Sequence, residues 1–132
     1  MLYVIKGDPI PLARPRFGNR CVWDSQKAKK VIAGIELRHQ HGDRPLFKKA
    51  LKVECVFYFK IPKTRTKTLK PNSVYFFKPD IDNLVKFVLD IANKICYTDD
   101  SIVAEITSKK LYDINPRTEI TIIEMDKSGK KS

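Results

Sequence analysis

The sequence predicts an α+β fold, a single small domain in which a mixed β-sheet has helices packed on it. The chain has 132 residues, of which 42% are hydrophobic, enough for one buried core but not for two. Its apolar residues recur with a period of two in some segments and of about 3.6 in others. The segments follow in the order β-α-β-α-β-β, which favours one sheet covered by helices. We place the domain at residues 1–126 and expect the polar, Lys-rich tail, 127–132, to be disordered.

The first half of the chain predicts a strand, a helix and a second strand. Residues 2–5 form a short strand, and the Gly- and Pro-rich run 7–18 forms an irregular loop. A helix then extends from about residue 24, where an Asp or a Ser can cap it, to about residue 40. The apolar residues that fit one face of this helix are Ala28, Val31, Ile32 and Ile35. Apolar and polar side chains alternate from 51 to 61, the clearest strand pattern in the chain.

The second half predicts a loop, a helix and two strands. The run 62–70 is basic and has no hydrophobic period, which indicates a mobile surface loop. A helix over 81–95 has Asp80 as its N-cap. Its apolar stripe consists of Ile81, Leu84, Val85, Val88, Ile91, Ala92 and Ile95. Residues 102–111 and 118–125 read as the closing strands.

The charge balance narrows the class of partner. There are 26 Lys and Arg against 15 Asp and Glu, a net charge of +11, which favours a polyanion such as DNA because neutralised phosphates release counterions. A membrane target is disfavoured, because we find no basic amphipathic helix, no lipidation signal, no signal peptide and no apolar run of about 20 residues. Three widely spaced cysteines and two histidines do not form a zinc pattern. We expect reduced thiols and a cytoplasmic protein.

Acidic doublets bracket the second predicted helix. Asp80 and Asp82 stand at its start, and Asp99 and Asp100 follow its end. Carboxylates are the ligands that Mg²⁺ prefers, and a divalent cation stabilises the charge that develops when a phosphodiester is attacked. A structural alternative remains open, in which Asp80 caps the helix, Asp82 pairs with Lys86 and the second doublet forms a turn. Convergence of the doublets requires that the second one fold back to the start of the helix.

Longer motifs around these acids resemble a known family. The run 78–90 reads KPDIDNLVKFVLD, and 97–101 reads YTDDS. Together with GDPIPLARPRF at 7–17 and the segments 110–112 and 116–120, these motifs are similar to the RusA family of Holliday junction resolvases, crossover junction endodeoxyribonucleases. The resemblance covers about 2–125. One difference from the family pattern is Lys94, where a glycine often follows the Asn at the helix end.

The resemblance implies a RusA-like fold and a set of site residues. Asp80, Asp82 and Asp100 would act together at a Mg²⁺ site, for which Mn²⁺ is a possible substitute. Asp99 would be a further metal residue there, or would assist or orient its neighbour. Lys86 would serve catalysis by stabilising the pentavalent phosphate or orienting water. For nucleic-acid contact we expect the loop cations and one amide, namely Arg14, Arg16, Arg20, Lys63, Arg65, Lys67, Lys70, Lys78 and Asn83. Phe17, Tyr75, Phe76 or Phe77 would stack on unpaired bases, or would instead lie in the core or in a dimer interface.

The sequence therefore predicts a Mg²⁺-dependent, structure-selective endonuclease that resolves Holliday junctions by paired symmetric nicks during DNA recombination and repair. Two matched cuts in a nearly two-fold symmetric junction favour a homodimer. The alternatives are a non-catalytic protein that binds branched DNA with the same basic surface, and a metal nuclease that acts on another nucleic-acid structure.

Overall fold

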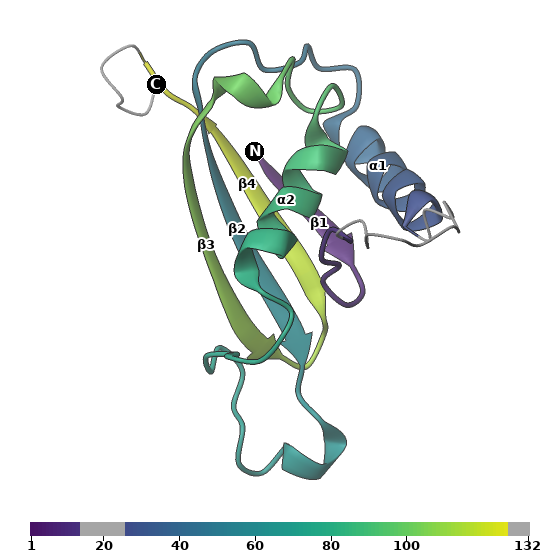
Figure 1. The fold of residues 1–132 in the computed structure, drawn as a ribbon, viewed down its shortest axis with the longest axis vertical. Helices are drawn as coiled ribbons and strands as arrows, with labels where there is room; N and C mark the ends of the chain where they lie inside the picture. Colours follow the sequence, from purple (N-terminus) through teal and green to yellow (C-terminus); the bar gives the residue numbers. More distant parts are fainter. Residues whose placement is uncertain (14–25, 127–132) are drawn as a thin grey trace, which may run out of the picture.

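A computed structural model describes residues 1–13 and 26–126 (Figure 1). Its elements are β1 (Leu2–Lys6), α1 (Lys27–His41), β2 (Leu51–Lys60), α2 (Ile81–Ala92), β3 (Val103–Asp113) and β4 (Arg117–Glu124), with 3-10 turns at Lys63–Arg65 and Asp100–Ile102. The predicted order β-α-β-α-β-β and the α+β class are confirmed. The predicted tail, 127–132, lies outside the described residues.

The four strands form one mixed sheet in the order β1-β4-β2-β3. β4 pairs antiparallel with both β1 and β2, whereas β2 and β3 are parallel, with Leu51 opposite Val103 and Lys60 opposite Asp113. Two parallel neighbours need a crossover, and α2 supplies it. The start of α2 therefore lies near the carboxyl ends of β2 and β3, and its end lies near the beginning of β3 (Figure 1).

One face of the sheet holds the core. Alternate residues of β2, from Leu51 to Phe57, are at most 1% exposed, as the alternating pattern predicts. Leu84 and Val88 of α2 and Leu37 of α1 belong to the same apolar cluster, so both helices cover the same face (Figure 1). Each such fully buried side chain contributes about 1.5–3 kcal/mol to folding. Cys55 and Cys96 are buried free thiols, and Cys21 lies outside the described residues.

The orientation of α1 differs from the prediction. Val31, Ile32 and Ile35 were expected to form its packing face, yet they are 54%, 59% and 61% exposed, and Ala28 is exposed as well. The buried side consists of Ala33, Gly34, Leu37 and His41. One reason is close packing: a Cβ at position 34 would lie only 3.2 Å from Cδ1 of Ile95, so the side with Gly34 faces α2. The other is a hydrogen bond, since the Tyr3 hydroxyl lies 2.7 Å from His41 Nδ1.

α2 is also shorter than predicted, since it ends at Ala92 rather than at Ile95. The backbone leaves the helical conformation at Asn93, whose ψ is 126°, and Lys94 then takes a φ of 64°, in the left-handed region. The amides of Ile95 and Cys96 then both donate to the Ala92 carbonyl. Lys94 thus occupies the conformation that a glycine would adopt without steric cost.

The loop between β2 and α2 has more structure than predicted. It extends beyond the end of the sheet (Figure 1), begins with the 3-10 turn Lys63–Arg65 and returns through Ser73–Tyr75, whose backbone pairs with the end of β3. Asn72, with a φ of 69°, makes the reversal. Among the residues that the structure describes, no helix has the length and apolar character needed to span a membrane.

Candidate active site

Asp80 and Asp82 lie at the amino-terminal end of α2. Asp80 occupies the N-cap position, but its side chain makes no cap hydrogen bond, so the capping alternative does not describe it. Both carboxylate residues are exposed and line a hollow of about 690 Å³. Its other lining residues are Val74, Tyr75, Ile81, Lys109, Lys110 and Leu111. Two acids and two lysines thus share one open hollow between the helix start and β3.

Lys110 fixes the segment that leads into Asp80. Its Nζ donates to the carbonyls of Phe77, at 2.6 Å, and Pro79, at 2.8 Å, and lies 5.5 Å from the centre of the Tyr75 ring. Our sequence reasoning missed this residue as a site residue. The sequence contained one sign of its role: Lys110 alternates with Ser108 and the buried Tyr112 on the face of β3 that the helix covers, where an apolar residue is usual.

Asp99 and Asp100 lie at the other end of α2. The Asp99 carboxylate accepts a hydrogen bond from the Ser101 amide at 3.0 Å. Hydrogen bonding from the Ser101 side chain, and then from this amide, lowers the Asp99 pKa. Asp100 Oδ1 lies 2.8 Å from the hydroxyl of Tyr97, which is also 3.0 Å from the Leu89 carbonyl. Burial, and then the hydrogen bond to Asp100, raise the Tyr97 pKa, so the phenol stays protonated and donates. Tyr97 is a second residue whose positioning role the sequence did not reveal.

The two acidic doublets are separated by the length of the helix. Twelve helical residues span about 18 Å, and the doublets stand at opposite ends. Accordingly, no three His, Cys, Asp or Glu side chains among residues 1–13 and 26–126 form a group that could hold a metal. The Asp80 end still fits Mg²⁺, which is often bound by one or two carboxylates together with waters and substrate phosphate.

Lys86 and Asn83 follow on the same helix. Lys86 is exposed one turn beyond Asp82 and forms no ion pair in the part of the chain that the structure describes. Asp90, four residues further along the helix, pairs with Lys30 of α1 at 3.3 Å. The Asn83 carbonyl accepts a hydrogen bond from the Leu12 amide at 2.9 Å, so the amino-terminal segment is tied to the helix start.

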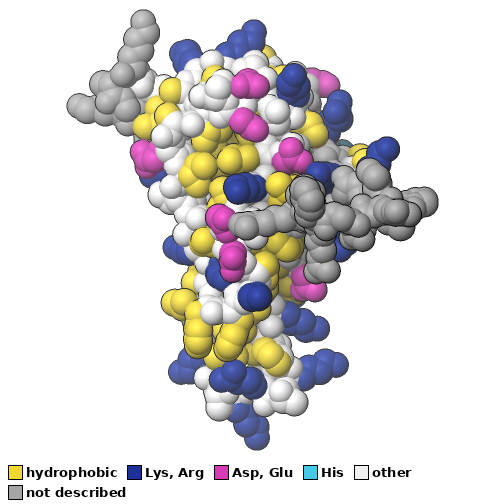
Figure 2. All heavy atoms as spheres, viewed as in Figure 1, with side chains coloured by type: hydrophobic (Ala, Val, Ile, Leu, Met, Phe, Trp, Pro, Cys, Tyr) yellow, Lys and Arg dark blue, Asp and Glu magenta, His cyan; other side chains and the backbone are white. Residues whose placement is uncertain are grey.

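The loop after β2 places cations and aromatic side chains beside the hollow. Its predicted contact residues Lys63, Arg65, Lys67, Lys70 and Lys78 are all exposed. Phe76 and Phe77 are 76% and 50% exposed and stack on each other at 4.6 Å, so they are not core residues. Tyr75, stacked on Phe59 at 3.9 Å, anchors them. Figure 2 shows hydrophobic side chains gathered over this loop with Lys and Arg around them.

The predicted contacts Arg14, Arg16 and Arg20, and also Phe17, lie outside the described residues. The described neighbours of that segment are well fixed, because the Gln26 side chain bonds both the Ala13 amide, at 2.7 Å, and the Pro11 carbonyl, at 2.5 Å.

Comparison with known proteins identifies the family. The chain is similar to an uncharacterized protein of Bacillus subtilis (strain 168), YqaN, with 28% identity covering 93% of this chain and 95% of that protein. The model of the RusA endodeoxyribonuclease family matches residues 6–123, a range that contains the hollow, both acidic doublets and the basic aromatic loop. The chain therefore belongs to the RusA endodeoxyribonuclease family, whose activity is that of a nuclease for Holliday junctions.

Proposed function

We propose that this protein is a Mg²⁺-dependent, structure-selective endodeoxyribonuclease of the cytoplasm that resolves Holliday junctions by paired symmetric nicks in recombination and repair. The observation that carries the proposal is the hollow in which Asp80 and Asp82 face Lys109 and Lys110, next to a basic loop with exposed aromatic rings. Acids that hold a cation and lysines that attract phosphate are both needed to bring a polyanion to a metal.

Asp80 and Asp82 would hold Mg²⁺ or Mn²⁺ through their carboxylate oxygens. Such a cation supplies charge neutralisation at the phosphate and lowers the pKa of a bound water. Lys86, one helical turn from Asp82, would stabilise negative charge that develops on the phosphate. Lys110 acts indirectly: by holding the carbonyls of Phe77 and Pro79, it fixes where the Asp80 carboxylate stands.

The basic loop would position the DNA. Its exposed lysines and Arg65 would contact phosphates, which sets register but reads no bases. Phe76 and Phe77 are exposed and directly follow Tyr75, which lines the hollow. They would stack on bases that are unpaired at a branch point, where stacking with an aromatic ring contributes about 1–3 kcal/mol per base. Structure selectivity would follow, because a continuous duplex offers no unpaired base to stack on.

The third carboxylate, Asp100, would come from a second copy of the chain. β3 is an edge strand, and no described residue pairs with its outer side from Val103 to Lys109, whereas Ser73–Tyr75 cover its last residues. Such a free edge is a ready template for another strand. Ile106, in the middle of this stretch, is 41% exposed and adds apolar surface.

The symmetry of such a dimer supports a shared site. A two-fold axis near Ile106 makes the two β3 strands antiparallel, so the beginning of one strand meets the end of the other. Asp100 stands just before β3, while Asp80 and Asp82 lie beside Lys110 near its end. Each hollow would therefore receive Asp100 from the partner subunit, with Asp99 orienting it, and the dimer would carry two matched sites for two matched cuts.

The first test is cleavage of a synthetic four-way junction. Wild-type protein should nick it symmetrically with Mg²⁺ or Mn²⁺ and not with EDTA. Asp82→Asn should bind the junction but cleave it at least about a hundredfold more slowly. Mutating a residue that only hydrogen-bonds a metal ligand typically costs about 10–100-fold in activity, and losing a ligand itself should cost more. Asp90→Asn, on the same helix but paired with Lys30, is the matched control and should cut normally. Cleavage without metal, or an active Asp82→Asn, contradicts the proposal.

The second test separates a shared site from a site within one chain. Asp82→Asn and Asp100→Asn are mixed, so that some dimers contain one copy of each. If Asp100 acts across the interface, one site in every mixed dimer regains all its carboxylates and nicking returns. If it acts within its own chain, both sites stay defective and the mixture remains inactive.

A further inference from the structure

We propose that the outer face of α1 is a docking surface for an acidic amphipathic helix of a partner protein. The face consists of Ala28, Val31, Ile32 and Ile35, a spacing of three to four residues that places them along one side of two helical turns. The three larger side chains are more than half exposed. This surface is independent of the proposed cleavage of junctions, because the acidic hollow lies at the opposite flank of α2, against β3.

Folding does not require these exposed aliphatic side chains. α1 is held to the sheet by its other side, where Ala33 is 2% and Leu37 is 0% exposed, and by the buried contact between His41 and Tyr3. α1 already buries one apolar side against the sheet. Its second apolar side exposes three β-branched residues to water and adds nothing to the stability of the fold. Such a patch is typical of an interaction site.

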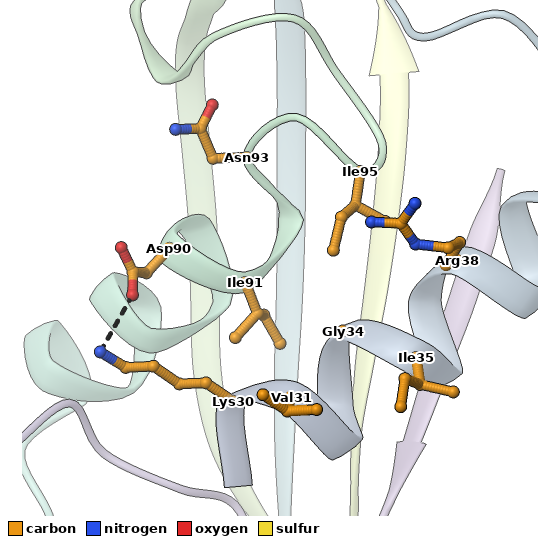
Figure 3. Close-up of a pocket in the computed structure, with 9 residues that line it drawn as sticks. All are labelled: Lys30, Val31, Gly34, Ile35, Arg38, Asp90, Ile91, Asn93 and Ile95. Carbon is orange, nitrogen blue, oxygen red and sulfur yellow. Dashed lines mark ion pairs between the residues drawn. The ribbon is translucent and has the colours of Figure 1, made fainter. Parts of the chain in front are cut away.

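The face continues into a groove between α1 and α2 (Figure 3). The groove has a volume of about 360 Å³; Val31 and Ile35 come from α1, and Ile91 and Ile95 come from α2 and the turn that follows it. Gly34 forms part of its floor, and the absence of a Cβ there lets Ile95 approach. A groove flanked by aliphatic side chains of two helices is the shape that receives one side of a third helix.

The charges around the groove select an acidic occupant. Lys27, Lys29 and Arg38 are exposed on α1, and Lys30 and Arg38 line the groove itself. Lys30 is paired with Asp90, as Figure 3 shows, so the net charge of the rim comes from the other cations. Acidic side chains that flank an apolar stripe would meet these cations while the stripe fills the groove.

The same charges argue against a second copy of this chain. Two α1 helices packed face to face would bring together two sets of the same cations, and Glu36 is the one acid that α1 contributes, half-buried. A stable dimer also needs about 800 Å² per partner. A few aliphatic side chains on two helical turns provide less than that, but they are sufficient for a helix bound in a groove.

The test uses a synthetic, fluorescein-labelled peptide with Leu at positions i, i+3, i+4 and i+7 and Glu at most other positions. Its binding to the full-length protein is followed by fluorescence anisotropy at near-physiological salt. The variant is Val31→Ser with Ile35→Ser, both at exposed positions that the core does not use. The matched control is Ile114→Ser, an isoleucine that is 66% exposed in the turn between β3 and β4.

The expected result is that the double variant weakens peptide binding by about tenfold or more, which corresponds to about 1.4 kcal/mol. Ile114→Ser binds like the wild type, and a scrambled peptide of the same composition binds no variant well. Equal binding of the scrambled peptide, or no effect of the double variant, overturns the proposal. So does conversion of a dimer to a monomer by the double variant, because the face is then a contact between copies. Junction cleavage by the double variant should equal that of the wild type, so failure here is distinct from failure of the nuclease proposal.

Discussion

The two ends of α2 both carry acidic doublets, but they use them differently. At the start of the helix the Asp80 carboxylate makes no cap hydrogen bond and faces an open hollow with Lys109 and Lys110. At the end, Asp99 caps a 3-10 turn and Asp100 is held by the buried Tyr97. Similar doublets in the sequence thus have different roles: the first lines an open hollow, and the second is also part of the fold. Substitutions at the two ends should therefore separate activity from stability.

Asp80→Asn and Asp100→Asn should both reduce junction cleavage by about a hundredfold or more, and this is the largest effect we expect. Their stabilities should differ. Asp80→Asn should leave the free energy of unfolding within about 0.5 kcal/mol of the wild type, whereas Asp100→Asn weakens a charge-assisted hydrogen bond and should lower it by about 1 kcal/mol. Urea denaturation and a cleavage assay measure the two effects. Equal stability of the two variants would contradict the conclusion that only the second doublet contributes to the fold.

Lys110→Met should reduce cleavage by about tenfold with less effect on DNA binding, because the carbonyls of Phe77 and Pro79 lose the donor that fixes the segment before Asp80. Lys109→Met is the control, since it removes the same charge from the same hollow without breaking those hydrogen bonds. Single-turnover cleavage at saturating protein distinguishes the two. If both variants lose activity equally, Lys110 acts by its charge and not by positioning.

Tyr97→Phe should lower the free energy of unfolding by about 1 kcal/mol, because it removes the hydroxyl whose one proton is donated to Asp100 or to the Leu89 carbonyl. Cleavage should fall several-fold, less than in Asp100→Asn, since the carboxylate remains but is less fixed. A thermal melt and a cleavage time course measure the two effects. Full activity with reduced stability would show that Asp100 needs no orientation.

Lys94→Gly should give the smallest effect and the opposite sign. Glycine adopts the φ of 64° at this position without the steric cost of a Cβ, so the variant should be about 0.5 kcal/mol more stable. Lys94→Ala is the control and should not be stabilised, because alanine keeps the Cβ. The denaturation midpoint checks this, and cleavage should not change in either variant.

The sequence predicted the fold well where one period dominates. The alternation in β2 and the wide apolar stripe of α2 each leave one choice of buried face. α1 has two apolar sides, and a hydrophobic period of 3.6 does not say which of them faces the sheet. The close packing at Gly34 and the hydrogen bond of His41 favour the side that is buried. The end of α2 was missed because Lys94 gives no sign of a left-handed conformation.

The candidate site could be predicted in its residue types but not in its assembly. The acids and loop cations follow from charge and motif, whereas Lys110 and Tyr97 act through carbonyls and a carboxylate that only the register of β3 and the turn after α2 bring close. The sequence also did not show that Asp100 lies far from Asp80 and Asp82 within one chain. The crossover from β2 to β3 places the two doublets at opposite ends of the helix.

The unpaired outer side of β3 has a consequence for handling and for evolution of this protein. In a single copy of the chain, no described residue pairs with the outer side of the seven residues from Val103 to Lys109, and such an edge invites adventitious strand addition and fibrillar association by unrelated chains. Glu105 and Lys109 stand on this edge and disfavour such misassembly, since a foreign apolar strand would have to desolvate them. These two charged residues therefore disfavour pairing with unrelated strands. Replacing them with neutral apolar residues should lower the solubility of the protein more than its folding stability.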